Sequence, residues 1–308
     1  MMNADRCEDV TAVVVTYSPG EGCGSLLLEL SRQCGHVVVV DNASDIDELE
    51  SLRRWCSAAA CELVELAANM GIAAAQNIGI ARARAHGARK VLLSDDDSVP
   101  TPRMVARLSA DLDQATGSLP VAAVGPLVGE VKPGGDQLVY RSRTWGPRRA
   151  TSVELARPLL PVAFLIASGC LIDIGALNSI GPMNEGLFID HVDLEWGLRA
   201  RNAGFALLVD TRVLMAHSLG DATVHVAGRA QPVHVHGPTR NYYLSRNTVL
   251  LIRSGLLGWR WSIGYLAWLI KYMAFNVLLV DRHRERFMMT VRGLRDGLRG
   301  RGGRLSLR

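Results

Sequence analysis

The sequence predicts a mixed α/β fold in which a Rossmann-like, mostly parallel sheet carries helices on both faces, followed by a C-terminal helical extension. In the first half of the chain, short apolar runs rich in β-branched residues alternate with amphipathic stretches of helical length. Hydrophobic residues make up 48% and charged residues 21% of the 308 residues, which is typical of a folded globular protein and excludes a disordered chain. Polar clusters follow the apolar runs, as expected where strands end at a binding site.

Four buried strands are expected in the first half, because their sequences are almost continuously apolar, as in parallel strands covered on both faces. They span residues 12–16, 37–40, 62–66 and 90–94, and the helices between them span residues 25–33, 45–57 and 72–86. In open α/β sheets, ligands bind beyond the carboxyl ends of the strands. The polar residues after these four strands therefore predict one site.

The second half is less regular. Residues 129–150 are rich in Gly, Arg and Pro and indicate a loop or hairpin, whereas residues 190–203 have helical periodicity that ends at Gly204. Residues 206–209 indicate a strand, and residues 221–239 a mobile loop. We expect one domain over residues 1–253, with a first half at about 10–125 and a second half at about 126–253, and an apolar helical extension with a basic tail over 254–308.

The extension combines an apolar stretch with positive charge. Residues 256–280 contain three Trp and two Tyr, but Arg260 and Lys271 leave only ten uncharged residues between them, where a membrane-spanning helix needs about 20. Residues 281–308 carry nine Arg against three acids, so the rest of a chain of net charge +4 is slightly negative. We therefore expect no nucleic-acid binding by the body. Helices packed on the body with a solvated tail, or contact with an anionic membrane surface, both fit this pattern.

The cysteines and the N-terminus predict a cytoplasmic location. None of the six cysteines occurs in a CxxC pair, so zinc-binding spacing is absent and free thiols are expected. Residues 1–10 contain three acids and no apolar run, unlike a signal peptide.

Three adjacent acids, Asp95, Asp96 and Asp97, end the fourth expected strand. Neighbouring carboxylates repel by roughly 1–4 kcal/mol per pair at about 4 Å, which a divalent cation relieves. Oxygen ligands suit Mg²⁺ or Mn²⁺, which complete their shells with water and phosphate oxygens. The alternative is a solvated turn before the next helix, with Thr101 as N-cap and Pro102 at its first position.

Two further polar clusters follow strands. Asp41 comes after four valines, where an acid can accept hydrogen bonds from a base or ribose. The alternative is a turn that opens the next helix at Asp45. Asn69, Gly71 and Asn77 precede and enter a helix, where Gly71 would permit close approach of a ligand to the backbone or simply serve helix packing.

A third set of acids lies in the second half. Asp190 and Asp193 are three residues apart and are expected to share a helix face, whereas Glu195 is four before Arg199 and suggests a surface ion pair. A carboxylate beside a diphosphate and metal site can accept a proton from an attacking hydroxyl group. His217 follows the last expected strand and is either a metal ligand or structural.

In this order, the elements over residues 10–252 resemble the nucleotide-sugar-dependent glycosyltransferases of family 2, which have the GT-A fold. The motifs that carry this resemblance are Val15-Thr16-Tyr17-Ser18-Pro19, Val40-Asp41-Asn42, Asn69-Met70-Gly71 with Asn77-Ile78-Gly79, Asp95-Asp96-Asp97-Ser98 and Ala200-Arg201-Asn202-Ala203-Gly204-Phe205. In that family's metal motif Gln commonly stands between the acids, at the position of Asp96 in this chain.

Within the family, the chain is most similar to the rhamnosyltransferases. The stretches that carry this likeness are Ser168-Gly169-Cys170-Leu171, residues 188–193, His217-Ser218-Leu219-Gly220 and Tyr242-Tyr243-Leu244-Ser245-Arg246-Asn247. Residues 296–303 are also similar to the second rhamnosyltransferase of rhamnolipid synthesis.

The resemblance implies inverting transfer of L-rhamnose from dTDP-L-rhamnose to a hydroxyl group of a lipid-linked or glycan acceptor, with Mg²⁺ or Mn²⁺. It implies a glycosyltransferase domain over residues 1–253, in which residues 10–125 are the nucleotide-sugar half and residues 126–253 the acceptor half. The apolar stretch and the basic tail of the extension predict that the enzyme is peripheral on the inner membrane face. The resemblance also implies that Asp193 is the catalytic base, that Asp95, Asp97 and His217 bind metal, and that Ser168, Gly169 and Asp190 bind the acceptor. The residues implied to bind the nucleotide sugar, with Asp41 at the thymidine, are Thr16, Tyr17, Asp41, Asn69, Gly71, Asn77, Asp95, Asp96 and Arg246.

Four alternative functions remain. The first is a glycosyltransferase that uses a different nucleotide sugar. The second is a metal-dependent nucleotidyltransferase, although residues 17–21 lack the basic, Gly-rich loop that such an enzyme needs. A phosphatase with a DxDxT motif would need Thr where Val99 stands. The non-enzyme alternative is a protein that only binds sugar or lipid.

Overall fold

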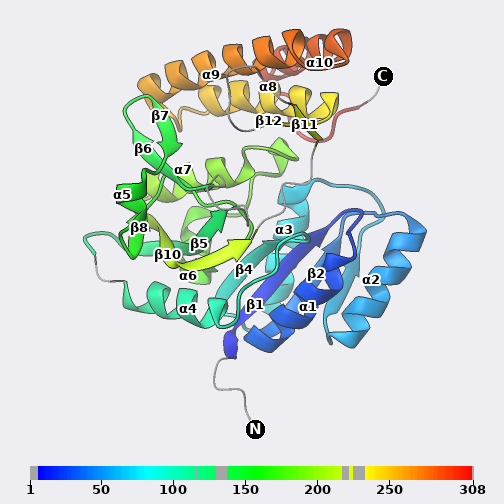
Figure 1. Cartoon of the computed structure of the whole chain (residues 1–308), viewed down its shortest axis with the longest axis vertical. Coiled ribbons are helices and arrows are strands. Elements are labelled where there is room, and N and C mark those ends of the chain that lie inside the picture. The colour runs from blue at the N-terminus through cyan, green and yellow to red at the C-terminus, as the bar shows by residue number, and fades with distance from the viewer. Residues whose placement is uncertain (1–5, 116, 130–136, 217–221, 225–232, 307–308) are drawn as a thin grey trace.

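A twisted eight-stranded sheet forms the centre of the computed structural model, which describes residues 6–115, 117–129, 137–216, 222–224 and 233–306 (Figure 1). Strand β1 (Cys7–Thr16) pairs in parallel with β2 (Cys34–Asp41) and β4 (Lys90–Asp95), and β2 pairs in parallel with β3 (Glu62–Glu65). The four strands expected in the first half are therefore confirmed, and they share one direction, so their carboxyl ends meet at one edge.

The sheet continues with strands from the second half. The short β9 (Cys170–Asp173) runs antiparallel between β4 and β5 (Val121–Gly129), β10 (Ala206–Ala216) is parallel to β5, and β8 (Leu159–Pro161) is antiparallel to β10. The strand order is β3-β2-β1-β4-β9-β5-β10-β8. The mostly parallel sheet expected from the sequence is confirmed.

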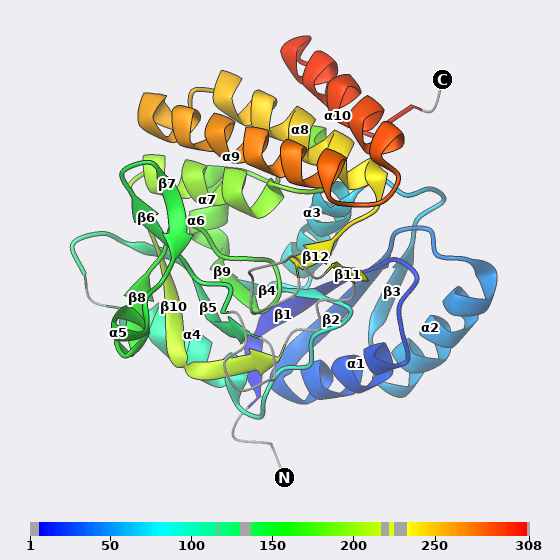
Figure 2. The same cartoon turned by 45° about the horizontal axis from the view of Figure 1, so that its top comes forward.

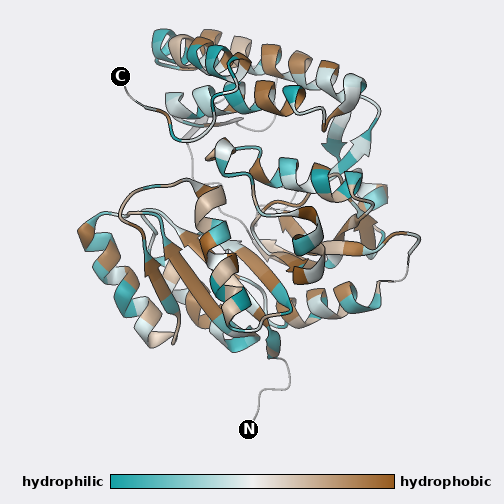
Figure 3. Ribbon diagram, turned by 180° about the vertical axis from the view of Figure 1, so that it is seen from behind, coloured by the Kyte–Doolittle hydropathy of each residue, from teal (hydrophilic) through white to brown (hydrophobic). Residues whose placement is uncertain are grey.

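Helices cover both faces of the sheet, because alternate residues of its strands point to opposite sides. Ala12 and Val14 pack with α1 (Gly22–Gln33), α2 (Ile46–Ala58) and α4 (Met104–Gln114). Val13 packs on the other face, where α3 (Ile72–Ala85), α6 (Ile174–Ile180) and α7 (Val192–Asn202) contribute buried side chains. The hydropathy colouring in Figure 3 shows the apolar strands between these layers.

Helix starts show where local signals hold and where they fail. Helix α2 opens at Asp45 with a capping box that Glu48 completes, as one interpretation of this stretch expected. The expected cap at Thr101 is wrong, because the Thr101 hydroxyl donates to the Leu214 carbonyl and the chain turns through a left-handed Arg103 before α4 begins.

The second half contains the expected hairpin, formed by β6 (Tyr140–Arg143) and β7 (Gly146–Arg149), followed by α5 (Ser152–Leu155). The short helix η1 (Glu185–Leu187) precedes α7. The stretch expected as a mobile loop, residues 221–239, instead contains the antiparallel strands β11 (Ala222–Val224) and β12 (Val233–Val235) and the start of α8 (Pro238–Arg253). Residues 221 and 225–232 of it lie outside the described residues.

Helices α8, α9 (Gly258–Leu278) and α10 (His283–Leu298) form a layer above α7 and the sheet (Figure 2). The apolar stretch is thus a single long helix, and no helix within the described residues is both long enough and apolar enough to cross a bilayer. The basic tail is not a solvated terminus, because α10 packs directly on α8. A Cβ at Gly293 would lie 2.3 Å from the Tyr242 carbonyl oxygen, and the Arg286 guanidinium is buried against the His236 carbonyl and Asn241.

Candidate active site

A cavity of about 800 Å³ lies at the carboxyl ends of the parallel strands. Its walls come from the loops after β1, β2, β3 and β4, from residue 167, and from the loop before α7. The structure brings together at this cavity many of the side chains expected from the sequence: Thr16, Tyr17, Asn69, Gly71, Asp95, Asp96, Asp97, Asp190 and Asp193.

The acid cluster follows β4, as expected. Asp95 accepts a short hydrogen bond from the Ser168 hydroxyl, Asp96 accepts one from the Tyr17 backbone N–H at 3.3 Å, and Asp97 accepts one from the Ser98 hydroxyl at 3.1 Å. Burial raises the pKa of Asp96 to about 6, and the neighbouring charges of Asp97 and Asp95 add to this shift. A cation beside the cluster would relieve the accumulated negative charge.

The donor set decides what kind of cation fits. Among the described residues, no three His, Cys, Asp or Glu side chains converge as a complete metal site. The carboxylates of the cluster instead suit a hard cation held by one or two protein oxygens, with water and phosphate oxygens completing its shell. His217, the third expected metal ligand, lies outside the described residues.

Asp193 lies in the first turn of α7 and faces the same cavity. One of its carboxylate oxygens accepts a hydrogen bond from the Ala167 N–H at 3.1 Å. Burial raises the pKa of Asp193 to about 7, with a further contribution from the negative charge of Asp95. A carboxylate with a pKa near neutrality is a suitable proton acceptor at physiological pH.

Asp190 does not share a helix face with Asp193, so that expectation is wrong. Helix α7 begins at Val192, and both Asp190 (φ 65°) and His191 (φ 62°) have left-handed backbones. The Asp190 carboxylate accepts two hydrogen bonds from the Arg240 guanidinium at 2.9 and 2.7 Å. Asp190 is therefore a charged, paired residue at the cavity wall, placed by the loop rather than by the helix.

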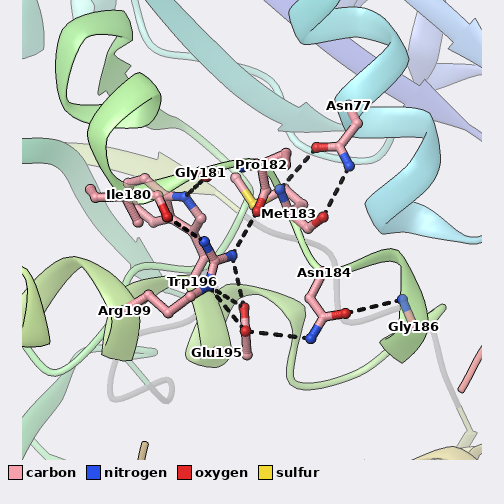
Figure 4. Close-up of polar contacts among 10 residues, drawn as sticks. All are labelled: Asn77, Ile180, Gly181, Pro182, Met183, Asn184, Gly186, Glu195, Trp196 and Arg199. Atoms are coloured by element: carbon pink, nitrogen blue, oxygen red, sulfur yellow. Dashed lines mark hydrogen bonds and ion pairs between the residues drawn. The ribbon is translucent and has the colours of Figure 1, made fainter. Parts of the chain in front are cut away.

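Asn77, expected to bind the nucleotide sugar, is not among the residues that line the cavity. Its side-chain amide donates to the Met183 carbonyl and accepts from the Met183 N–H, both at 2.9 Å (Figure 4). The expected ion pair between Glu195 and Arg199 is present, but Glu195 is only 6% exposed, so the pair is buried rather than on the surface. Arg199 also donates to backbone carbonyls before α7 and ties the two segments together (Figure 4).

Four other expected site residues are not among those that line the cavity: Asp41, Ser168, Gly169 and Arg246. Ser168, expected to bind the acceptor, is 1% exposed and donates its hydroxyl to Asp95. The Asp41 carboxylate is 1% exposed and accepts hydrogen bonds from the Thr16 hydroxyl and the Ser44 N–H, so it joins two loops instead of lining the cavity. Gly169 has φ 80°, and a Cβ there would collide with Pro126 and Met215. Arg246 is fully buried and donates to the carbonyls of Leu187 and Gly303, which leaves it no access to a phosphate.

Several cavity residues were not predicted from the sequence. Asn42 directly follows Asp41 in the Val40-Asp41-Asn42 motif, so the motif could have indicated it. Nothing in the local sequence distinguishes Arg240 or His236 as site residues. Phe188 also lines the cavity. Its carbonyl oxygen accepts a hydrogen bond from the Ile72 N–H at 2.7 Å, which holds residue 188 beside the start of α3. At Gly71 (φ 89°) a Cβ would lie 2.5 Å from that oxygen, so the position requires glycine.

A second cavity of about 610 Å³ adjoins the first between the β6–β7 hairpin and helices α7, α8 and α9. It shares Asp190, His191, Asp193, His236 and Arg240 with the first cavity. Its remaining walls are rich in aromatic rings, contributed by Tyr140, Trp145, Phe164, Tyr265 and Trp268.

Comparison with known proteins identifies the family. No protein-family model matches the chain. The chain is 30% identical over 296 residues to dTDP-rhamnosyl transferase RfbF of Shigella flexneri, which covers 95% of this chain and 96% of RfbF. This chain belongs to the rhamnosyltransferase family of glycosyltransferases.

Solved structures confirm the GT-A fold of this rhamnosyltransferase. GalNAc-T7 in complex with UDP, GalNAc and Mn²⁺ aligns with a TM-score of 0.61 and 14% identity, covering 94% of this chain and just over half, 56%, of GalNAc-T7. The mannosyltransferase PcManGT of Pyrobaculum calidifontis, in complex with GDP-Man and Mn²⁺, aligns with a TM-score of 0.53 and 15% identity, covering 94% and 75% of the two chains.

Proposed function

We propose that this rhamnosyltransferase moves L-rhamnose from dTDP-L-rhamnose to a hydroxyl group of a glycolipid or glycan acceptor, with inversion at the anomeric carbon. The name of RfbF, a dTDP-rhamnosyl transferase, suggests this donor. RfbF is similar to this chain over almost its whole length. The observation that carries the proposal is that one cavity holds both an acid cluster after β4 and the carboxyl group of Asp193.

The proposed reaction is a single in-line displacement. The acceptor oxygen attacks the anomeric carbon of rhamnose, its proton passes to the Asp193 carboxylate, and the bond from that carbon to the dTDP oxygen breaks. Asp193 suits this role because burial and the charge of Asp95 raise its pKa to about 7. The hydrogen bond from the Ala167 N–H fixes one carboxylate oxygen.

Asp95 and Asp97 would hold a divalent cation, which when bound supplies positive charge for the leaving diphosphate. Mn²⁺ accompanies the nucleotide in the GalNAc-T7 complex and the nucleotide sugar in the PcManGT complex, which supports metal use by this fold. Ser168 would orient Asp95 through its hydrogen bond. Thr16, Tyr17, Asn69 and Gly71, which lie at or beyond the ends of β1 and β3 and line the same cavity, would bind the donor.

The acceptor would enter through the second cavity, because this cavity shares Asp190 and Asp193 with the first. Its aromatic rings offer flat faces for sugar rings or apolar groups. Asp190 and Arg240, which face both cavities, would contact the acceptor near the attacking hydroxyl group.

The enzyme would work as a peripheral protein on the inner face of the membrane. Trp259, Ile263, Leu266 and Ile270 form an exposed stripe along α9, with Arg260 and Lys271 on the same helix. An apolar stripe flanked by basic residues is typical of helices that lie in the interface of an anionic membrane.

The test is nucleotide release from dTDP-L-rhamnose in the presence of candidate acceptors, with UDP- and GDP-sugars as competing donors. Products are identified by mass spectrometry, and the configuration of the new bond by NMR. We expect acceptor-dependent release of dTDP. The new glycosidic bond should have a single anomeric configuration, opposite to that of the donor. Turnover with a UDP- or GDP-sugar, but not with dTDP-L-rhamnose, would show that the donor is another nucleotide sugar. Release of rhamnose 1-phosphate in place of dTDP would indicate nucleotidyl transfer.

A further inference from the structure

Residues 302–305, which follow α10, lie against the loop that leads to α7. We call residues 302–305 the strap and residues 185–191 the cavity loop. The Gly303 N–H donates to the Gly186 carbonyl at 2.7 Å. The backbones approach so closely that a Cβ at Gly302 would lie 2.8 Å from the Gly186 carbonyl oxygen.

Two side chains of α8 connect the strap to the cavity loop. The buried guanidinium of Arg246 donates to the Gly303 carbonyl at 2.5 Å and to the Leu187 carbonyl at 2.8 Å. The Tyr243 hydroxyl accepts from the Leu305 N–H at 2.9 Å, while its ring stacks on Phe188 with centroids 5.0 Å apart. Each side chain therefore contacts the strap on one side and the cavity loop on the other.

The cavity loop needs such support because its backbone is strained. Phe188, Asp190 and His191 have φ values of 65°, 65° and 62°, in the left-handed region that non-glycine residues seldom adopt. Such conformations persist only where the surroundings over-determine them. Asn247 of α8 adds hydrogen bonds to the carbonyls of Leu187, Ile189 and Asp190.

The cavity loop also reaches the donor side of the site. The Phe188 carbonyl accepts from the Ile72 N–H, and the loop passes directly into the helix that carries Asp193. A shift of this loop would therefore move both a wall of the nucleotide cavity and the proposed base.

We propose that the strap is a positioning element of the active site, which holds the cavity loop in the conformation that nucleotide binding and Asp193 require. Leu305 completes this contact, because it is 9% exposed and packs in one cluster with Tyr242, Tyr243 and Phe188. The kinetic consequence rests on the proposed function, whereas the conformational consequence does not.

The test compares two shortened chains, one that ends at Arg301 and a matched control that ends at Ser306. Because α10 keeps its packing on α8, we expect both to fold with similar melting temperatures. Amide hydrogen exchange should accelerate at residues 186–190 in the variant that ends at Arg301, while α10 stays protected. Its affinity for dTDP should fall, and its kcat/KM should fall by about 10-fold or more, since a misplacement of about 1 Å can cost 100-fold.

Point variants test the same contact if the shorter chain does not fold. Tyr243→Phe removes the hydroxyl that accepts from Leu305 and keeps the ring on Phe188. The matched control is Tyr242→Phe on the same helix, whose hydroxyl donates to Asp296 of α10 at 3.0 Å. We expect Tyr243→Phe to increase exchange at residues 186–190 and lower kcat/KM, and Tyr242→Phe to change only the melting temperature.

Unchanged exchange at residues 186–190 in Tyr243→Phe, and in the Arg301-ended chain where that chain folds, would overturn the positioning role. The exchange measurement needs no sugar donor. A protein that shows the exchange change but transfers no rhamnose would therefore contradict the proposed function and leave the strap proposal standing.

Discussion

The Arg240 guanidinium donates two hydrogen bonds to the Asp190 carboxylate at the point where the two cavities meet. The Asp190 side chain is only 9% exposed, and its charge is one of the causes that raise the pKa of Asp193. The ion pair therefore keeps a negative charge close to the proposed base while largely neutralising it.

Substitutions at this pair should move the acid limb of the pH profile in opposite directions. Arg240→Gln leaves the Asp190 charge uncompensated, so the pKa of Asp193 and the acid limb of kcat/KM should rise. Asp190→Asn removes that charge, so the limb should move to lower pH, while KM for the acceptor rises more than kcat falls. Arg54→Gln on α2 is the control, and identical limbs in all variants would show that the pair does not act on Asp193.

Activity should depend on a single deprotonation near neutral pH. Because the pKa of Asp193 is raised to about 7, kcat/KM should fall about tenfold per unit as the pH drops below that value. Asp193→Asn should lower kcat by about 10²–10⁴-fold, the usual contribution of a general base. Its affinity for dTDP, measured by calorimetry, should stay nearly unchanged. A near-normal kcat in Asp193→Asn would transfer the role of base to Asp190.

The same raised pKa has a consequence for stability. The folded state holds a proton on Asp193 up to about pH 7, whereas the unfolded chain releases it near pH 4, so this group lowers stability as the pH rises between these values. Asp193→Asn lacks this loss. We expect its melting temperature, relative to the native chain, to be higher at pH 8 than at pH 5 in metal-free buffer. Equal differences at the two pH values would contradict the raised pKa.

Turnover should require a divalent cation bound through the acid cluster. EDTA should abolish dTDP release, and Mg²⁺ or Mn²⁺ should restore it. Asp97→Ala should remove the metal-dependent rate while circular dichroism stays that of the native protein. A rate that EDTA leaves unchanged would mean that Asp95 and Asp97 do not bind a catalytic metal.

Membrane attachment should depend on the exposed face of α9. A variant with Ile263→Ser and Ile270→Ser removes two apolar side chains that are 52% and 59% exposed, so less protein should sediment with anionic vesicles. High salt should release part of the native protein, because each basic residue near the surface contributes about 1 kcal/mol and salt screens this term. Val153→Ser on α5, an apolar side chain that is 79% exposed and lies outside α9, is the control. If the native protein does not sediment with anionic vesicles, the proposed membrane attachment is wrong.

The parallel half of the sheet was predictable because each strand there is a continuous apolar run, with a helix between it and the next. Strand β9 was not, since its residues Cys170–Asp173 are an apolar stretch whose partners, β4 and β5, lie far away in sequence. The direction of such a short strand is decided by tertiary pairing. Local propensity carries no information about it.

The candidate site was predictable to the level of strand ends and less well to the level of side chains. Asp95, Asp96 and Asp97 line the cavity as expected, because the strand delivers them there. Asp41 follows a strand in the same way, yet its carboxylate turns inward to Thr16 and Ser44. Arg240 comes from a helix 50 residues beyond Asp190, and only the packing of α8 over the cavity loop reveals it.

Five residues line both cavities, so donor and acceptor binding at these cavities should be interdependent if the proposed function holds. A bound donor that fixes the conformation of residues 190–193 would also fix part of the acceptor site. The acceptor should therefore bind the donor complex more tightly than the free enzyme. By thermodynamic reciprocity, the acceptor must then tighten donor binding by the same factor. A rhamnosyltransferase built in this way favours an ordered sequence of binding steps, in which little of the sugar donor is lost to water before the acceptor arrives.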